Sequence, residues 1–414
     1  MNLTITPNFK LFNYQQTQQS RTSTVTNNMP KSIKSDAVSF TAKKIPDHVI
    51  SPFSNAVEQS YLSQLGKFVD SAKEFHGALA RVCAKLEDLG FVYDKTYNSK
   101  HPLKSQLSYI DKFERQGYVQ DAVRGTVYWL NQQDIGAFKK FIEAMKDEGF
   151  EIATFKRFNK DTKKFVKVPD LEIRQSGIEK KDLEILGPFL SKAEISKPRT
   201  TSRYSDYQMR FVNSHKRGKS ENKQPLELII LYGPHYSKAK EAESKYVYDI
   251  VRLLEKVHIN LKVNYPERSP ARRIVNNIDV IKTRLREDIS KPLFLNAYIS
   301  DAKLRGEEKL PVVVSKVHAK MLDGYMSGVR QKIPLHYKEM RQKAKSDEFI
   351  SQLIANTVDY QERENKNITP EEIKAFRESY LDKLMVLEAE DVAIVAKAQD
   401  MLKETLDKYI EKDV

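Results

Sequence analysis

The chain has 414 residues, of which 40% are hydrophobic and 30% charged, the composition of a soluble globular protein with room for two or three domains. Its formal net charge of +14 favours polyanionic partners such as nucleotides or RNA, although a solvated basic surface is an equally common reason for such a surplus. The single cysteine, Cys83, excludes a disulfide framework and argues against a thiolate metal site. The N-terminus lacks a signal-peptide pattern, and no apolar run approaches the roughly 20 residues that cross a bilayer, so we expect a cytoplasmic protein without a membrane partner.

The predicted elements start after a polar N-terminal segment. Residues 1–45 hold too few large apolar side chains to offset the entropy of ordering, so we expect disorder there. Apolar residues then recur at three- and four-residue steps over 55–89, which predicts one or two amphipathic helices. The patterns that follow predict, in turn, a helix at 104–115, a strand at 121–130, a helix at 135–148 ended by Gly149, and a strand at 150–155.

The middle of the chain is harder to interpret. Residues 159–200 are polar and lysine-rich, and we expect only a short helix near 180–186. Beyond them the patterns predict strands at 204–212 and 226–232 and a helix at 237–256. Helices and strands in this order predict an α+β fold in which helices flank one mixed β-sheet.

After Pro266 the chain is expected to be mostly helical to its end. Thr369 is predicted to cap a helix whose first residue is Pro370 and whose first turn carries carboxylates. The last helix, 387–410, has coiled-coil-like spacing. We therefore expect three parts, namely a disordered segment at 1–45, a sheet domain with its N-terminal helices at 46–260, and a helical region at 261–414 through which a protein partner or an oligomer could be bound.

The first candidate functional residues are Lys104 and Lys112, which are eight residues apart. On one helix this spacing is a little over two turns, so both lysines would lie on similar faces and could touch one polyphosphate. Ser105 could cap that helix through its hydroxyl. Taken alone, the pattern is equally that of a solvated helix with two surface lysines.

Two carboxylates provide the second candidate site. Asp121 starts a predicted strand, where it could bind Mg²⁺, an ion that usually takes one or two carboxylates together with substrate phosphates. Glu227 lies within an apolar strand, where burial would be costly without a partner or a metal. On neighbouring strands the two residues would form a site that holds Mg²⁺ and activates a hydroxyl; otherwise they are an ion-paired Asp and an exposed Glu.

An aromatic residue adds a third candidate. Tyr204, in the run Arg203-Tyr204-Ser205-Asp206-Tyr207, starts a predicted strand and could stack against a purine base. A tyrosine packed at a sheet edge is the alternative.

Together these motifs resemble the synthetase domain of the RelA/SpoT family in its stand-alone form. The shared order is a Lys-Ser-x-x-Ser-x-x-x-Lys helix, an Asp-led strand with an arginine soon after, a basic segment, a Tyr-led strand, and a Glu in an apolar strand followed by a helix. The resemblance covers residues 95–255. It implies a nucleotidyltransferase-like fold and an Mg²⁺-dependent pyrophosphokinase that moves the β,γ-pyrophosphate of ATP to the ribose 3′-hydroxyl of GDP or GTP, forming the alarmone guanosine tetraphosphate.

The resemblance also implies roles for individual residues. Asp121 and Glu227 would be the catalytic residues and the Mg²⁺ ligands, with Glu227 as the alternative general base. Tyr204 would stack on the acceptor base. The ATP phosphates would be bound by Lys104, Ser105, Ser108, Lys112, Arg124, Lys156 and Arg157.

The sequence departs from the family pattern in several places, including the turn Ser202-Arg203-Tyr204 in place of Asn-Gly-Tyr and the unusually long stretch 159–200. Pro102 stands where the family has an arginine, and Gln208 stands where a histidine is expected. One alternative is a toxin that pyrophosphorylates the 3′ end of tRNA, which the positive charge and the basic stretch 159–200 would favour. The other is a catalytically inactive nucleotide-binding or interaction protein in which the helical region is the working part.

Overall fold

The computed structural model describes residues 52–116, 119–159, 163–196, 203–214, 225–261, 269–357 and 367–412. The expected disorder of residues 1–45 lies outside this set. The chain forms two compact units, whose boundaries fall within two long helices, α9 (Lys316–Lys343) and α12 (Pro370–Tyr409). The larger unit comprises 51–336 and 387–414, and the described part of the smaller one comprises 337–357 and 367–386.

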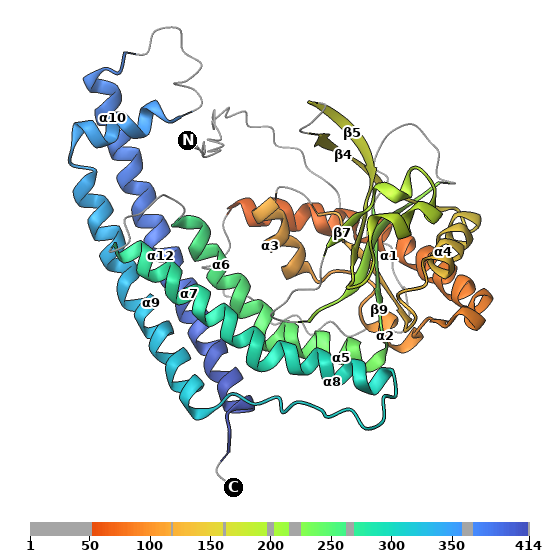
Figure 1. The fold of residues 1–414 in the computed structure, drawn as a ribbon. Coiled ribbons are helices and arrows are strands. Elements are labelled where there is room, and N and C mark those ends of the chain that lie inside the picture. Colours follow the sequence, from red (N-terminus) through yellow and green to blue (C-terminus); the bar gives the residue numbers. More distant parts are fainter. Residues whose placement is uncertain are drawn as a thin grey trace, which may run out of the picture. The chain divides into compact units, whose positions relative to one another are not determined.

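A mixed seven-stranded sheet is the centre of the larger unit (Figure 1). Neighbouring strands β2 and β9 are parallel, β8 is antiparallel to β9 and to β6, and β6 and β7 are parallel. This mixed sheet and the helices around it confirm the expected α+β class. Across the sheet the strands are β1 (Phe91–Val92), β2 (Val123–Trp129), β9 (Leu226–Leu231), β8 (Asp206–Asn213), β6 (Leu171–Arg174) and β7 (Glu194–Ser196), and β3 (Phe150–Ile152) also pairs with β8.

One face of this sheet is apolar. Alternate residues of the central strands, such as Tyr207 and Met209 in β8 and Leu228 and Ile230 in β9, are fully buried on it. They pack in one core with α1 (Pro52–Lys85) and α4 (Ile135–Asp147), which lie on this side of the sheet (Figure 1). Because side chains alternate along a strand, the residues in between project to the opposite face.

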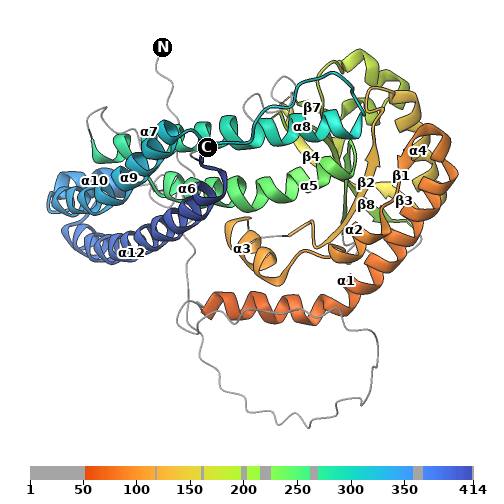
Figure 2. The ribbon, with the colours of Figure 1, turned by 90° about the horizontal axis from the view of Figure 1, so that it is seen from below.

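The opposite face is covered by helices only in part. Helices α5 (Pro234–Glu243) and α8 (Lys291–Asp301) lie side by side (Figure 2). Their residues Tyr236 and Phe294 pack with Tyr128 of β2 and Leu231 of β9, so they cover the ends of these two strands. The remainder of this face carries charged side chains.

The other described elements are mostly short. The smaller unit has its own apolar cluster around Ala344, Ile350 and Ile354. Among the described residues, no helix combines the length and apolarity needed to cross a membrane. The remaining helices are α2 (Lys95–Lys100), α3 (Gln106–Gln116), α6 (Asp249–Asn260), α7 (Pro270–Leu285) and α10 (Asp347–Ala355), and strands β4 (Thr154–Asn159) and β5 (Lys164–Pro169) pair in a separate two-stranded sheet.

Most sequence predictions of elements are confirmed, and the differences have local causes. The predicted strand 150–155 is two strands, because the N–H of Ala153 donates to Arg210 O at 2.7 Å whereas its carbonyl accepts from Asp170 N at 2.8 Å. The stretch 159–200 contains the expected short helix at 180–186 and also the unpredicted strands β5, β6 and β7. The predicted helix 237–256 is interrupted by a π-helical turn at Ser244–Tyr248.

The start of α12 agrees with the sequence in detail. The hydroxyl of Thr369 accepts from the N–H of Glu372 at 3.2 Å, and the Glu372 carboxylate accepts from the N–H of Thr369 at 3.0 Å. This reciprocal pair is a capping box, and Pro370 is the first helical residue as predicted. The helix continues without a break through the predicted segment 387–410 to Tyr409.

Candidate functional site

A strip of polar side chains crosses the uncovered part of the sheet. Arg124 of β2 is the register partner of Glu227 of β9, which in turn is the partner of Arg210 of β8. Gln208 of β8 is likewise the partner of Glu172 of β6. Directly opposite residues project to the same face with side chains about 4.5–5.5 Å apart, so register alone brings these charges together.

Asp121 lies at one end of this strip, next to the start of β2. It is only 3% exposed, and three cations contact its carboxylate. Lys104 Nζ lies 3.0 Å from Oδ2, Lys112 Nζ lies 3.0 Å from Oδ1, and an Arg124 terminal nitrogen lies 2.7 Å from Oδ2. The two lysines therefore converge on one carboxylate, although Lys104 precedes the helix that was predicted to carry both.

Lys104 is positioned beside Asp121 by backbone hydrogen bonds at the start of β2, and not by a helix. Its N–H donates to Ala122 O at 2.8 Å, and the N–H of Arg124 donates to Pro102 O at 2.9 Å. These bonds flank an antiparallel bridge between Leu103 and Val123, so residues 102–104 are attached to the edge of β2. Pro102 has no N–H to offer, but this arrangement uses only its carbonyl.

Lys112 is carried by α3, which begins just after Lys104. The Ser105 hydroxyl accepts from the N–H of Ser108 at 3.4 Å and lies 3.0 Å from the Ser108 hydroxyl, so Ser105 caps the helix as predicted. Asp121 contacts Lys104 and Lys112 but neither serine, and binding of phosphate by Ser105 and Ser108 stays a prediction.

The charges around Asp121 shift the pKa values of both Asp121 and Lys104. Burial alone would raise the pKa of Asp121, but Arg124, Lys104 and Lys112 outweigh it and hold that pKa well below its ordinary value. Burial, and then the nearby Arg124 guanidinium, lower the pKa of Lys104 to about 8 in spite of the attraction of Asp121. Lys104 is therefore poised to lose its proton at mildly alkaline pH.

Glu227 is the second buried carboxylate, at 3% exposure. Its Oε1 accepts a hydrogen bond of 2.7 Å from the Gln208 amide and lies 4.0 Å from Arg210. Its Oε2 lies 3.5 Å from Arg124 Nε. The Arg124 guanidinium thus contacts both Glu227 on β9 and Asp121, which lies two residues before β2 begins at Val123 rather than on the strand as predicted.

This corner of the strip has a surplus of positive charge. Among the described residues, four cations, Lys104, Lys112, Arg124 and Arg210, lie within 4.0 Å of the two carboxylates, two positive charges more than that pair compensates. Asp170 also accepts from Arg210, at 2.9 and 3.0 Å, which reduces the surplus to one. A polyanion could therefore be bound here by cations that exchange a carboxylate for a phosphate.

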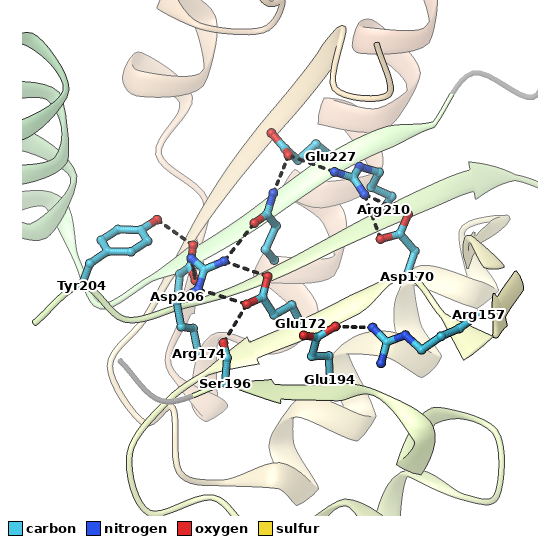
Figure 3. A network of polar contacts seen from close by, with 11 residues as sticks. Arg157, Asp170, Glu172, Arg174, Glu194, Ser196, Tyr204, Asp206, Arg210 and Glu227 are labelled. Atoms are coloured by element: carbon cyan, nitrogen blue, oxygen red, sulfur yellow. Dashed lines mark hydrogen bonds and ion pairs between the residues drawn. The ribbon is translucent and has the colours of Figure 1, made fainter. Parts of the chain in front are cut away.

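The strip continues toward β6 and β7 (Figure 3). Arg174 contacts Glu172 at 2.8 Å and Asp206 at 2.8 Å, and it also donates to the Gln208 amide oxygen at 3.4 Å. Gln208 therefore connects the Glu227 corner to the Arg174 corner. The Ser196 hydroxyl donates to Glu172 at 2.7 Å, which completes this part of the network.

Tyr204 lies beside the strip, two residues before β8 begins at Asp206 rather than at its start as predicted. Its hydroxyl donates to Asp206 at 2.6 Å, and its ring packs against Tyr236 and Phe294 (ring centroids 6.2 and 5.2 Å away). Arg174 and Lys240 each lie 5.6 Å from the ring centroid. Burial, and then the Asp206 carboxylate, raise the pKa of Tyr204. Stacking on an acceptor base stays a prediction, and the base would have to share this ring with its present contacts.

Lys156 and Arg157 lie elsewhere. Both belong to β4, and Arg157 pairs with Glu194 of β7 (Figure 3). Strand β7 is three positions from β9 in the sheet, about 14 Å at the usual strand spacing. The structure thus brings together Lys104, Lys112, Asp121, Arg124 and Glu227, whereas the basic pair of β4 is at the other edge.

The donor set would suit Mg²⁺ only together with a substrate. Among the described residues, no group of three or more His, Cys, Asp and Glu side chains could hold a metal ion. Asp121 and Glu227 supply the one or two carboxylates that Mg²⁺ usually takes in proteins, where phosphate oxygens and water complete its shell.

Several residues of the strip were not predicted from the sequence, namely Asp170, Glu172, Arg174, Asp206, Arg210 and Lys240. A signal was present, because Asp206, Gln208 and Arg210 alternate with buried apolar residues along β8. That alternation indicates a strand with one polar face.

No family model and no curated protein sequence matches this chain.

Proposed function

We propose that the polar strip is the active site of a nucleotidyltransferase-like domain that transfers pyrophosphate from ATP to the ribose 3′-hydroxyl of a guanine nucleotide. The observation that carries the proposal is the Arg124 guanidinium, which contacts two buried carboxylates, Asp121 just before β2 and Glu227 on the neighbouring strand β9. Two further cations, Lys104 and Lys112, also contact Asp121. Such a cluster combines carboxylates for a metal or a proton with cations for phosphate.

In the proposed reaction the 3′-oxygen attacks the β-phosphorus of ATP. A bond forms between these atoms, the bond from the β-phosphorus to the oxygen bridging the α- and β-phosphates breaks, and AMP leaves. The hydroxyl proton passes to the carboxylate of Glu227, which Gln208 and Arg124 hold in place. Lys104, Lys112 and Arg124 offset the negative charge of the phosphates.

Asp121 would hold Mg²⁺, which supplies neutralisation of developing phosphate charge when bound with ATP, and Glu227 would be its second ligand in the alternative in which it is not the proton acceptor. Tyr204, Ser105 and Ser108 would contribute to nucleotide binding as the family resemblance implies.

An inactive protein is the rival interpretation. Every carboxylate of the strip has a cationic or amide partner, and a closed ion-pair network of this kind also occurs without catalysis. The surplus of cations around Asp121 favours the enzymatic interpretation, because one carboxylate does not require three cations.

The test is incubation of the full chain with Mg²⁺, ATP labelled in its γ-phosphate, and GDP, GTP or bulk tRNA as acceptor. We expect label on a guanine nucleotide and its loss in Glu227→Gln, a variant that keeps an acceptor for the Gln208 amide. Glu194→Gln is the matched control, because Glu194 pairs with Arg157 at the far edge. Label on tRNA alone would identify the acceptor as RNA. Absence of transfer to every acceptor by the folded protein would reject the proposal.

A further inference from the structure

The two-stranded ribbon formed by β4 and β5 has two different faces. Lys156 is the register partner of Lys167, and Phe158 is the partner of Phe165. Because directly opposite residues share a face and residues two apart along a strand share it too, these four side chains lie together. We call this set the Lys–Phe face.

The other face of the ribbon contacts the body of the domain. It carries Phe155 and Arg157 from β4 and Val166 and Val168 from β5. Val168 is buried, and Arg157 pairs with Glu194 of β7. The Lys–Phe face therefore points away from the sheet to which the ribbon is attached.

The aromatic half of the Lys–Phe face is exposed to solvent. Phe158 is 49% exposed and Phe165 69%, and their ring centroids are 5.4 Å apart with the planes at 64°. A cross-strand aromatic pair stabilises a ribbon, but that purpose does not require so much ring surface in water. The exposed rings offer flat surfaces on which bases could stack.

The basic half of this face is electrostatically unfavourable by itself. Lys156 and Lys167 are exposed and directly opposite each other, and like charges in that position destabilise a strand pair. Within the described part of the chain, neither lysine forms an ion pair with a carboxylate. An anion bound between the two ammonium groups would remove this repulsion.

We propose that the Lys–Phe face binds single-stranded RNA. Unpaired bases stack on Phe158 and Phe165, and a backbone phosphate lies between Lys156 and Lys167. The lysine pair and the phenylalanine pair are two residues apart along the strands, about 6.8 Å. A base of one nucleotide can therefore stack on a ring while a neighbouring phosphate lies between the lysines. The formal net charge of +14 favours the same class of partner.

Exposed phenylalanine with lysine also occurs on surfaces that bind anionic membranes. Insertion into a bilayer would need apolar residues at the tip of the ribbon. The six residues that run from Asn159 to Lys164 between the two phenylalanines include no apolar residue. The aromatic rings are flanked by lysines on a strand face instead, an arrangement that favours RNA.

Binding at the Lys–Phe face is independent of the proposed transfer reaction and would hold if the strip were inactive. The ribbon nevertheless adjoins the strip, because Arg157 pairs with Glu194, whose register partner is Glu172. RNA bound to the ribbon would therefore lie at the β7 edge of the strip, away from Asp121 and Glu227.

The first experiment measures fluorescence anisotropy of a labelled single-stranded RNA of mixed sequence titrated with the full chain. The double variant Phe158→Leu/Phe165→Leu keeps apolar contacts across the ribbon but removes the rings, and we expect it to bind about tenfold more weakly. Phe155→Leu is the matched control on the other face and should bind like the wild type. Thermal unfolding of each variant checks the fold.

The second experiment measures the salt dependence of the same binding. In Lys156→Gln/Lys167→Gln the slope of log affinity against log salt should fall in magnitude by about 0.7, the value for one single-strand phosphate contact. Lys67→Gln/Lys73→Gln, on the exposed surface of α1, changes the net charge equally and should leave the slope unchanged.

Four results would overturn the inference. They are no RNA binding by the wild type at low salt, wild-type affinity in the Phe158→Leu/Phe165→Leu variant, equal affinity for duplex RNA, and binding of anionic phospholipid vesicles but not RNA through the same four residues.

Discussion

Arg124 shows how the site depends on single residues. Its guanidinium touches both buried carboxylates, yet 37% of its side chain is exposed. It can therefore turn toward a ligand in the open part of the strip, because Asp121 would keep Lys104 and Lys112 as partners and Glu227 would keep Gln208 and Arg210. Lys104 differs, because its side chain is only 8% exposed and Asp121 is its ion-pair partner.

Removal of the Asp121 charge should destabilise the fold. In Asp121→Asn the cations Lys104, Lys112 and Arg124 lose their shared partner, and we expect a loss of about 3 kcal/mol in the free energy of unfolding, near the low end for a broken buried pair. Two of these cations can turn to water, which limits the cost. Urea unfolding at pH 7 measures the effect. Asp147→Asn, which breaks an exposed pair, should change it by less than about 1 kcal/mol.

We also expect Asp121→Asn to change how the free energy of unfolding depends on pH. The pKa of Asp121 is lower in the folded chain than in the unfolded one, so its stabilisation is fully present above the unfolded carboxyl pKa, about 3.9, and is lost as pH falls toward the folded pKa. The wild type should therefore lose stability below about pH 4 more steeply than Asp121→Asn. Equal slopes in urea unfolding at acid pH would contradict the role assigned to its three cations.

Lys104 predicts a second pH effect, in nucleotide binding. Its pKa of about 8 means that the charge needed for a phosphate disappears at alkaline pH. If the proposed site binds ATP, the affinity should fall by up to about tenfold for each pH unit above 8. Lys104→Met should bind more weakly at pH 7 and lack that additional decline. Calorimetric titrations at pH 7, 8 and 9 measure this, with the exposed Lys156→Met as control; a decline in Lys104→Met equal to that of the wild type would reject it.

About half of the residues of the polar strip could be predicted from the sequence. Lys104, Lys112, Asp121, Arg124 and Glu227 were recognised because their spacing and order are visible along the chain. Arg174 and Asp170 were missed, because they lie in a polar stretch and reach the strip only through the pairing of β6 with β8. Long-range pairing of this kind leaves no local pattern.

At the scale of elements, the close packing of α1 on β2 leaves no room for a side chain at position 125, which is Gly125. A Cβ added there would lie 2.6 Å from Leu79 Cδ1 and 3.0 Å from Phe75 Cε1, in the centre of the core. Only glycine lets the helix approach the strand so closely. This strand also carries Arg124 on its opposite face, so the fit against α1 positions the site.

Gly125→Ala should therefore destabilise the chain by about 1–3 kcal/mol, the usual cost of overpacking a core. Gly66→Ala is the matched control within α1, because a Cβ there meets nothing within 4 Å. It should stabilise the helix by about 0.5–1 kcal/mol, since alanine loses less backbone entropy than glycine. Urea unfolding measures both, and a Gly125→Ala protein as stable as the wild type would contradict the close approach.

The elements themselves show where periodicity predicts structure and where it does not. Long amphipathic segments such as α1 and α4 were predicted because their apolar residues repeat over many turns. Strands β6 and β7 have only four and three residues, too few for an alternation to stand out within a lysine-rich stretch. The apolar residues keep a helical spacing across the π-helical turn at Ser244–Tyr248, so the sequence predicts one continuous helix there.

At the scale of the whole molecule, the two compact units have separate apolar clusters. The larger unit is built on the sheet core, with members such as Phe138 and Leu228. The smaller unit is built on Ala344, Ile350 and Ile354 with a few partly buried neighbours, among them Phe376. A core of that size stabilises a structure only slightly, so the smaller unit should open while the sheet stays folded.

Hydrogen exchange with peptide-level detection tests this separation. Ile350 is fully buried, and Ile350→Ala should cost about 2–5 kcal/mol, enough to open a small helical unit. Exchange should then accelerate in α10 and in residues 370–386, whereas β2, β8 and β9 should keep their wild-type protection, because no apolar cluster described for the sheet includes Ile350. Ile278→Ala, at a fully buried position in α7 of the larger unit, is the matched control and should leave α10 protected in the native state. Faster exchange in β9 of Ile350→Ala to the same degree as in α10 would mean that both units unfold together.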